Sequence, residues 1–326
     1  MSNWVRAHTN IALIKYWGKK DEDLIIPMNN SLSLTLDAFY TDTRVTFDDA
    51  LTADELYLDD MLQDFTALKK VKTVLDLVRE KAGIRSKAKV ESYNHVPTAA
   101  GLASSASGLA ALAGAASLAA GLELSSVELS RLARRGSGSA SRSIYGGFAE
   151  WQKGSSDETS FAVPVDDADW DIGMLFIVVS DKKKDVSSRE GMSRTVRTSP
   201  FYQGWLDSLD EDLNAMKQAI KKQDIDKVGV IAEQNALKMH ATTLGAKPPF
   251  TYWSPDSLKA MDSVRALREQ GYSVYFTMDA GPNVKLICRQ SQLEEIRTHL
   301  LSDFTGSQLI AARPGPALHV VTGPEL

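Results

Sequence analysis

The chain has 326 residues, of which 43% are hydrophobic and 24% charged, and this is the composition of a globular protein. Its net charge of −5 argues against a nucleic-acid-binding protein, and no segment reaches the ~18 continuous apolar residues that a membrane span needs. Because Cys288 is the single cysteine and the first ten residues lack the apolar core of a signal peptide, we expect a cytoplasmic protein without an internal disulfide.

The first half of the sequence predicts alternating strands and helices. Polar and apolar residues alternate over 31–37, as in a half-buried strand. Further strands are expected at 43–47, 54–64, 88–96, 146–154 and 171–180. Helices are expected at 66–80, where apolar residues recur at helical spacing, in the alanine-rich run 109–121, and at 125–135. The last of these has Ser125 or Ser126 as its N-cap and Gly136 as its stop.

The second half changes character. Residues 199–271 are expected to be mainly helical, with Ser257 as the cap of the final helix. Two strands, 272–279 and 283–289, flank the turn "AGPN", and a helix over 291–304 and a strand near 318–322 complete the chain. The simplest arrangement is two α+β lobes joined near residues 180–200.

Residues 96–108, "VPTAAGLASSASG", place small side chains directly before the alanine-rich helix. The first N–H groups of a helix are unpaired and attract anions, and small residues let a phosphate approach them closely. Serine hydroxyls can bond phosphate oxygens or a magnesium ion. The segment lacks the lysine of a GxxxxGK[ST] loop. A tight, serine-capped helix start is the other interpretation of the same residues.

A second Gly/Ser segment, "RRGSGSASRS" (134–143), contains Arg142. Arginine can bind a phosphate or carboxylate through two parallel hydrogen bonds. Taken alone, the segment is also typical of a solvated loop between helices. Two such segments in one lobe favour a ligand with several phosphates, such as a nucleotide beside a phosphorylated substrate.

Three more segments could belong to the same site. "NIALIKYWGKK" gathers lysines and aromatic residues near the N-terminus, although a lysine-rich surface turn is the alternative. "DKKKDVSSREGM" (181–192) lies at the expected junction of the lobes, where ligand clefts form, or is a charged linker. In "FTMDAGPNVK", Asp279 ends an apolar strand and is either a turn residue or a general base. The five histidines show no metal-ligand spacing, and neither a GxSxG elbow nor a complete dinucleotide fingerprint is present.

Together these motifs resemble one enzyme family. "PTAAGLASSASG" is similar to the phosphate loop of the galactokinase, homoserine kinase, mevalonate kinase and phosphomevalonate kinase superfamily. "NIALIKYWGK", "SGSASRS", "KKDVSSREGM" and "FTMDAGPNVK" resemble the bacterial diphosphomevalonate decarboxylases within it. The motifs span residues 10 to 285, and "YWGK" and "MDAGPN" are specific to that branch.

The resemblance implies a fold and an activity. It implies an N-terminal lobe similar to ribosomal protein S5 (1–182) and a ferredoxin-like C-terminal lobe (183–326), both α+β. The implied reaction converts mevalonate 5-diphosphate to isopentenyl diphosphate with ATP and Mg²⁺, and releases ADP, phosphate and CO2. The implied protein is a cytoplasmic homodimer that binds neither nucleic acid nor membrane.

The resemblance also implies roles for individual residues. Asp279 would orient or deprotonate the C3 hydroxyl, Lys184 would meet the γ-phosphoryl group, and Arg142 would hold the substrate carboxylate. Substrate binding, chiefly of the diphosphate, is expected from Tyr16, Trp17, Gly18, Lys19, Ser137, Gly138, Ser139, Ala140, Ser141, Ser188 and Arg189. ATP binding is expected from Pro97, Ala100, Gly101, Leu102, Ala103, Ser104, Ser105, Ala106 and Ser107, with Ser107 as an Mg²⁺ ligand.

Some questions stay open at the level of sequence. Lys69, Lys70 and Lys72 are equal candidates to reach the nucleotide, and residues 200–270 receive no catalytic role. A kinase of the same superfamily that phosphorylates a hydroxyl without decarboxylation is the close alternative. A non-catalytic small-molecule sensor on the same fold is the more distant one.

Overall fold

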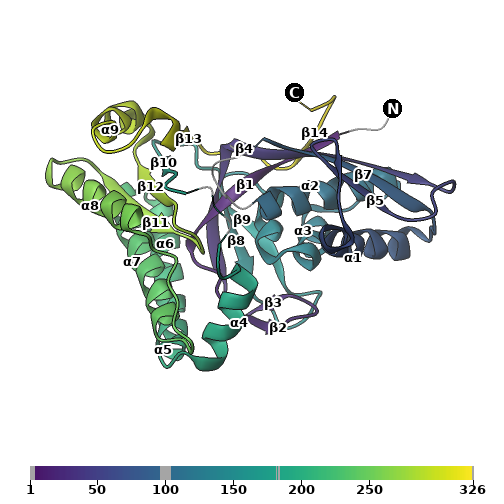
Figure 1. The fold of residues 1–326 in the computed structure, drawn as a ribbon, viewed down its shortest axis with the longest axis horizontal. Coiled ribbons are helices and arrows are strands. Elements are labelled where there is room, and N and C mark those ends of the chain that lie inside the picture. The colour runs from purple at the N-terminus through teal and green to yellow at the C-terminus, as the bar shows by residue number, and fades with distance from the viewer. Residues whose placement is uncertain (1–3, 96–103, 181, 183, 325–326) are drawn as a thin grey trace.

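The computed structural model describes residues 4–95, 104–180, 182 and 184–324, and Figure 1 shows them as two α+β lobes. The first lobe holds the strands β1 (Trp4–Ile14), β4 (Ser31–Asp48), β5 (Glu55–Leu58), β6 (Met61–Leu62), β7 (Lys87–His95), β8 (Phe148–Gln152) and β9 (Phe161–Asp166), with a small hairpin of β2 (Lys19–Asp21) and β3 (Ile26–Pro27). Its helices are α1 (Phe65–Ala82), α2 (Ser104–Ala119), α3 (Ser126–Gly136) and the 3-10 helix η1 (Gly138–Ile144).

The sheet of the first lobe runs in the order β14-β1-β4-β7-β5-β6, and β8 and β9 extend it from β4. The helices α1, α2 and α3 pack on one face of this sheet and share a hydrophobic core with it. Alanines fill the contact surface of α2, which allows the helix to lie close against β1 and β4. This close packing brings the start of α2 next to the strands that carry the predicted site.

An irregularity in β1 explains how this strand serves both faces of the sheet. The pairing of β1 with β4 shifts register between His8 and Asn10. Thr9 bonds to Ser107 of α2 and Asn10 to Ser139 of η1, so consecutive side chains point to the same face. Beyond the shift, the residues that would otherwise face the helices face the second lobe.

The second lobe is built on a four-stranded antiparallel sheet in the order β11-β12-β10-β13. Its strands are β10 (Gly173–Ile177), β11 (Val274–Met278), β12 (Val284–Cys288) and β13 (Leu309–Ala312). Its helices are α4 (Ser188–Thr198), α5 (Tyr202–Asp207), α6 (Leu209–Lys221), α7 (Ile225–Leu244), α8 (Pro255–Glu269) and α9 (Leu293–Leu300), and the short 3-10 turns η2 (Gln290–Gln292) and η3 (Gly306–Gln308) flank α9 and β13. Numbered within the lobe, the strand order is 2-3-1-4 in a βαββαβ sequence, so the ferredoxin-like α+β prediction is confirmed.

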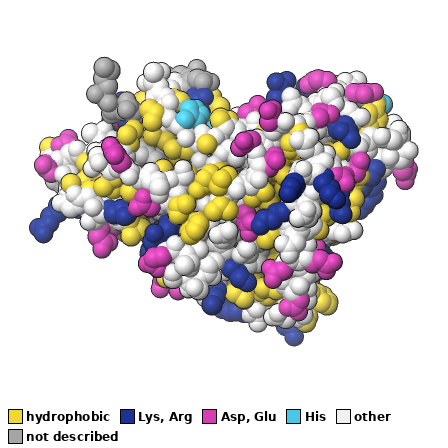
Figure 2. Space-filling view, turned by 180° about the vertical axis from the view of Figure 1, so that it is seen from behind, with side chains coloured by type: hydrophobic (Ala, Val, Ile, Leu, Met, Phe, Trp, Pro, Cys, Tyr) yellow, Lys and Arg dark blue, Asp and Glu magenta, His cyan; other side chains and the backbone are white. Residues whose placement is uncertain are grey.

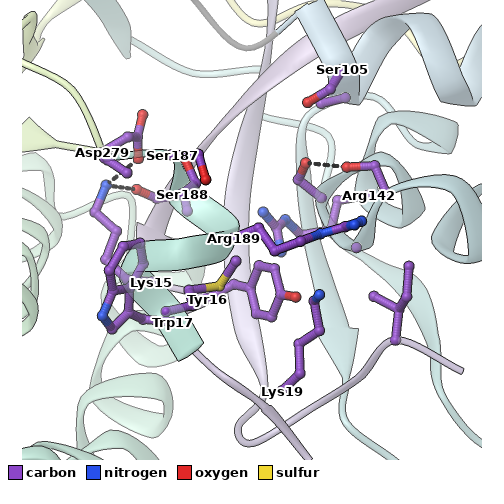
Figure 3. A pocket seen from close by; sticks show the side chains of 18 of the residues that line it. Lys15, Tyr16, Trp17, Lys19, Ser105, Arg142, Ser187, Ser188, Arg189 and Asp279 are labelled. Atoms are coloured by element: carbon purple, nitrogen blue, oxygen red, sulfur yellow. Dashed lines mark hydrogen bonds and ion pairs between the residues drawn. The ribbon is translucent and has the colours of Figure 1, made fainter. Parts of the chain in front are cut away.

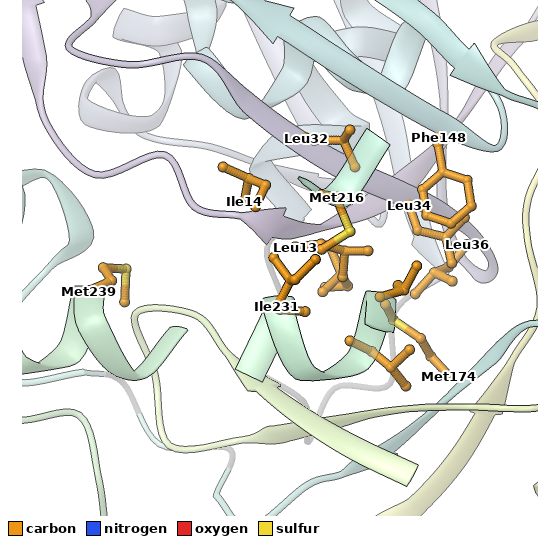
Figure 4. Close-up of a cluster of buried hydrophobic side chains, with 14 of the residues drawn as sticks. Leu13, Ile14, Leu32, Leu34, Leu36, Phe148, Met174, Met216, Ile231 and Met239 are labelled. Carbon is orange, nitrogen blue, oxygen red and sulfur yellow. The ribbon is translucent and has the colours of Figure 1, made fainter. Parts of the chain in front are cut away.

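A further hydrophobic cluster lies between the lobes (Figure 4). Leu13 of β1 and Leu34 of β4 meet Met174 of β10 and Met216 of α6, and all four are fully buried. The last strand, β14 (His319–Val321), returns from the second lobe to pair with β1. The lobes therefore share a continuous core, which holds residues from both in a fixed relation around any site between them.

The structure corrects several local expectations. Residues 31–37 and 43–47 belong to one long strand, β4, and Gly136 is the last residue of α3 rather than a stop beyond it. The N-cap of α8 is Ser254, three residues before the expected Ser257, because Pro255 takes the first helical position. The strand β10 pairs within the second sheet, so we propose to move the lobe boundary from residue 182 to the segment before Gly173.

The surface carries mixed charge. On the face shown in Figure 2, acidic and basic side chains are interspersed. Within the described residues, no helix combines the length and the apolar content that a membrane span requires.

Candidate active site

A cavity of about 470 Å³ lies between the lobes (Figure 3). Its walls come from the end of β1, the start of α2, the α3–η1 connection, the segment before α4 and the turn after β11. The residues predicted from the sequence that line it are Tyr16, Trp17, Lys19, Ser105, Ala106, Ser137, Gly138, Ser139, Arg142, Lys184, Ser188, Arg189 and Asp279. Five motifs that are far apart in the chain thus meet in one cavity.

The other predicted residues occupy supporting positions or lie outside the description. Gly18, Ala140, Ser141 and Ser107 are not among the residues that line the cavity. Pro97, Ala100, Gly101, Leu102 and Ala103 lie outside the described residues, as does the side chain of Ser104, the first residue of α2.

Ser107 faces the sheet rather than the cavity. Its hydroxyl is fully buried, 2.8 Å from Oγ1 of Thr41 and 3.4 Å from Oγ1 of Thr9. These contacts hold α2 against β1 and β4. Ser105, in contrast, lines the cavity and is exposed, so its hydroxyl is the better placed of the two for a phosphate or metal ligand.

Gly138, which lines the cavity, and Gly18, which lies beside it, are both required to lack a side chain. Gly18 has φ +122°, and a Cβ there would collide with the Tyr202 hydroxyl, which bonds to the Trp17 carbonyl at 2.7 Å. A Cβ at Gly138 would lie 2.6 Å from the Trp151 ring. The two glycines therefore let neighbouring aromatic rings pack directly under the backbone.

Arg142 lies at the floor of the cavity with 2% of its surface exposed. Nε bonds to Oγ of Ser33 at 2.8 Å, Nη1 to Oγ of Ser31 at 2.5 Å, and Nε and Nη2 to Oδ1 of Asn10 at 3.3 and 3.2 Å. Burial lowers its pKa to about 10, which leaves the guanidinium charged at neutral pH. Its described hydrogen-bond acceptors are all neutral, so the charge is positioned without being neutralised by an adjacent carboxylate.

Asp279 lies on the opposite side of the cavity, between two lysines. Nζ of Lys15 is 2.8 Å from its Oδ1, and Nζ of Lys285 is 3.3 Å from its Oδ2. Burial by itself raises the pKa of Asp279, but the charges of Lys15 and Lys285 outweigh burial and hold the pKa well below its usual range. The side chain remains 38% exposed while lining the cavity, so an ionised carboxylate faces the ligand space.

Lys184 approaches Asp279 from the segment that precedes α4. A Cβ at Gly281 would lie only 3.2 Å from Cε of Lys184, so the lysine passes directly over the turn after Asp279. Asn283 fastens this segment, because its Oδ1 accepts the N–H groups of Val179 and Ser180 at 2.8 and 3.0 Å. Burial, followed by the charge of Lys285, lowers the pKa of Lys184 below the ordinary lysine value.

Two contributions to the site were not predicted. Lys15 belongs to the N-terminal motif, which assigned it no individual role, yet its side chain contacts the predicted catalytic aspartate. Residues 200–270 supply Met239 to the cavity wall and Asn235, whose Oδ1 accepts the Lys15 backbone N–H at 2.9 Å. The segment "EQNALKMHATT" carries both residues, and the only signal in the sequence was the segment itself, since the burial of its asparagine is visible only in the structure.

A second cavity, of about 160 Å³, adjoins the first and is more apolar. Leu56, Leu58, Val71 and Leu109 are among its walls. Ser105 and Lys70 line both cavities, and of the three candidate lysines of α1 Lys70 is the one among the described lining residues. The pair of cavities has room for a flat apolar group beside a strongly charged one.

The charge of the main cavity restricts what it can bind. Lys15, Lys19, Lys70, Arg142, Lys184 and Arg189 line it, whereas Asp279 is the one acidic residue among the described lining residues. Lys15 and Arg142 are buried, whereas Lys70 and Arg189 are exposed at the rim, and an anionic ligand in the cavity would balance this excess of positive charge. The arrangement suits phosphoryl transfer to a hydroxyl held at the carboxylate.

Known proteins are similar to this chain in sequence and in fold. A diphosphomevalonate decarboxylase-like N-terminal domain matches residues 7–162, and a mevalonate 5-diphosphate decarboxylase C-terminal domain matches residues 174–314. The diphosphomevalonate decarboxylase of Ganoderma lucidum is 37% identical over 317 residues, which cover 89% of this chain and 79% of the relative.

Solved structures show higher identity. One described as MDDEF in complex with MVAPP, AMPPCP and magnesium is 59% identical, with a TM-score of 0.94 over 98% of this chain and 99% of the other. The mevalonate diphosphate decarboxylase of Staphylococcus aureus is 53% identical, with a TM-score of 0.95 over 98% of both chains.

Proposed function

We propose that the protein decarboxylates mevalonate 5-diphosphate with consumption of ATP, because the chain belongs to the diphosphomevalonate decarboxylase family. The product is isopentenyl diphosphate, with release of ADP, phosphate and CO2. The observation that carries the proposal is the cavity between the lobes, where an ionised Asp279 faces the buried guanidinium of Arg142. The similar structure solved with MVAPP, AMPPCP and magnesium supports the same pair of ligands here.

Phosphorylation of the C3 hydroxyl is the first chemical step. Hydroxide is a poor leaving group, and transfer of the γ-phosphoryl group converts the C3 oxygen into part of a good one. We assign Asp279 to accept the hydrogen bond of that hydroxyl, to direct its lone pair at phosphorus, and to take its proton as the O–P bond forms and ADP leaves. Lys184 balances the negative charge that spreads over the transferring phosphoryl oxygens.

Loss of phosphate and loss of CO2 complete the reaction. Departure of phosphate from C3 builds positive charge there, and the electron pair of the C–CO2 bond then forms the double bond. This requires the carboxylate to be held in line with C3. Arg142 suits the task because its guanidinium is rigidly held by three neutral partners and retains its charge.

The diphosphate of the substrate is assigned to two further cationic side chains and to three hydroxyl groups of the cavity wall. Tyr16, Lys19 and Arg189 lie near one another in Figure 3, and Ser137 and Ser139 also line the cavity. The diphosphate oxygens would accept hydrogen bonds from these side chains. Binding energy from this distant group then orients C3 between Asp279 and Arg142.

The nucleotide is assigned to the start of α2 and the adjoining apolar cavity. Ser105 and Lys70, which line both cavities, would contact the phosphates, and the apolar walls would hold the base. Mg²⁺ fits this site as a partner of the phosphates: the described residues contain no cluster of three acidic, histidine or cysteine ligands, and Mg²⁺ commonly binds through phosphates with few protein oxygens. Ser105 is the residue proposed to reach the ion, which supplies charge neutralisation of the phosphates when bound.

The alternative of a kinase without decarboxylation is not favoured, since the matched domains and relatives are decarboxylases. The test of the proposed chemistry is the variant Arg142→Ala. It should reduce CO2 release by about a hundredfold or more, because truncating a buried charged partner removes both alignment and charge. The 3-phosphorylated intermediate should then become detectable by phosphorus NMR. CO2 release at the wild-type rate would contradict the assignment.

A homodimer and a cytoplasmic location remain predictions. The oligomeric state can be measured by sedimentation.

A further inference from the structure

Lys285 occupies an unusual place for a lysine. It lies in the middle of β12, paired with Phe176 of β10 on one side and Thr277 of β11 on the other, and 3% of its surface is exposed. Ile287, two residues along the same strand, belongs to the core between the lobes. Burying a charged side chain on such a face costs free energy unless the charge has close partners. The contacts of Lys285 therefore indicate its role.

The ammonium group of Lys285 has two described partners, both on the turn after β11. Nζ donates to the carbonyl oxygen of Asn283 at 3.1 Å and lies 3.3 Å from Oδ2 of Asp279. Asn283 is the residue whose side chain holds Val179 and Ser180, at the exit of β10. Lys285 thus lies under the turn that presents Asp279 and is connected to the segment that leads to Lys184.

Asp279 is held on both oxygens. Oδ1 accepts from Lys15, which comes from the end of β1 in the first lobe, and Oδ2 faces Lys285 from the second lobe. Two contacts from different sheets restrict rotation of the carboxylate, which one contact alone would leave free. The charged or titratable groups that influence Asp279 are Lys15, Lys285, Lys184, Arg142 and His240, and His240 is neutral because burial lowers its pKa to about 3.

We propose that Lys285 is a positioning residue for the reaction, which orients the Asp279 carboxylate toward the C3 hydroxyl and keeps it ionised. The inference rests on the proposed function for the identity of that hydroxyl. Lys285 is not among the residues that line the cavity, so it acts through Asp279 rather than on a ligand. Without Lys285, the contact of Lys15 with the other oxygen would remain, and the carboxylate could rotate about that single contact.

The test compares three variants. Lys285→Met removes the charge at similar length, Lys285→Arg keeps it, and Thr277→Val is the matched control. Thr277 lies beside Lys285 on the same sheet face, is fully buried, and its hydroxyl has no hydrogen-bond partner within the described residues. We expect Lys285→Met to lower kcat by about tenfold or more with KM for mevalonate 5-diphosphate changed by less than about threefold. Lys285→Arg and Thr277→Val should stay within about fivefold and twofold of the wild-type kcat.

A double-mutant cycle separates positioning from mere stabilisation. In an Asp279→Asn background, Lys285→Met should cause little further loss of kcat, because its partner no longer carries the charge. An equal loss in both backgrounds would overturn the proposal, as would a Lys285→Met kcat within about twofold of wild type. Lys285→Gln, which keeps a donor for the Asn283 carbonyl, serves the same comparison should the methionine variant fail to fold.

A measurement without turnover separates this proposal from the assignment of the reaction. The carboxyl 13C resonance of Asp279, identified by its loss in Asp279→Asn, is followed as pH falls in the unliganded protein. Lys285→Met should titrate at least about one pH unit higher than wild type. Identical curves would overturn the proposal, whereas a wild-type protein inert toward mevalonate 5-diphosphate would overturn only the assigned reaction.

Discussion

Asp279 combines partial exposure to the cavity with two lysine contacts, and this combination makes its charge testable. The variant Asp279→Asn keeps the size of the side chain and removes the charge. We expect kcat to fall by roughly a hundredfold to ten-thousandfold, the range for loss of a positioned acid–base group. The affinity for mevalonate 5-diphosphate, measured by calorimetry, should change little, because the proposal assigns the diphosphate to other residues. A variant with near wild-type kcat would reduce Asp279 to a turn residue.

Lys184 gives the activity a pH dependence of predictable sign. Burial and then the charge of Lys285 lower its pKa, so the ammonium loses its proton at lower pH than an exposed lysine does. Activity should therefore fall as pH rises through that lowered pKa. Lys184→Arg should move the alkaline limb of the kcat profile upward, since a guanidinium stays charged. If both proteins lose activity at the same alkaline pH, Lys184 is not the group responsible.

At the scale of elements, the turn between β1 and β2 depends on Gly18. An alanine there would meet the Tyr202 hydroxyl of α5 and adopt a backbone conformation that L side chains rarely take. Gly18→Ala should destabilise the protein by about 1–3 kcal/mol or more and displace Trp17 and Lys19. Gly204→Ala in α5 is the control, because a Cβ added there would have nothing within 4 Å. Thermal unfolding compares the two, and equal melting temperatures would contradict this account of the turn.

Elements with local signals were predictable, and those that depend on distant partners were not. The capping box of Ser125 and Glu128 begins α3 where the sequence indicated. In contrast, residues 181–192 were open to interpretation as a charged linker, yet α4 begins within them at Ser188 and directs Arg189 into the cavity. The strand β13 also escaped prediction, since its four residues pair with β10, which lies far away in the sequence.

At the scale of the molecule, the sequence indicated which segments form the candidate site, but it did not indicate which side chains within them contact one another. The small-residue loops and the aspartate turn were recognisable by composition and by family resemblance. The ion pair of Lys15 with Asp279 joins residues 264 positions apart, and no local pattern predicts such a contact. Lys285 lies in "VKLIC". Its apolar neighbours indicate a buried strand, but they do not indicate which group the lysine contacts.

The central claim is that one cavity phosphorylates C3 and then removes the carboxylate held at Arg142. The most direct measurement supplies ATP, Mg²⁺ and mevalonate 5-diphosphate labelled with 14C at C1, and follows ADP, inorganic phosphate and labelled CO2 together. The account predicts equal amounts of all three throughout the reaction, because phosphate departure and CO2 loss share one electron pair. ADP formed without labelled CO2 would contradict it and would leave a 3-kinase in its place.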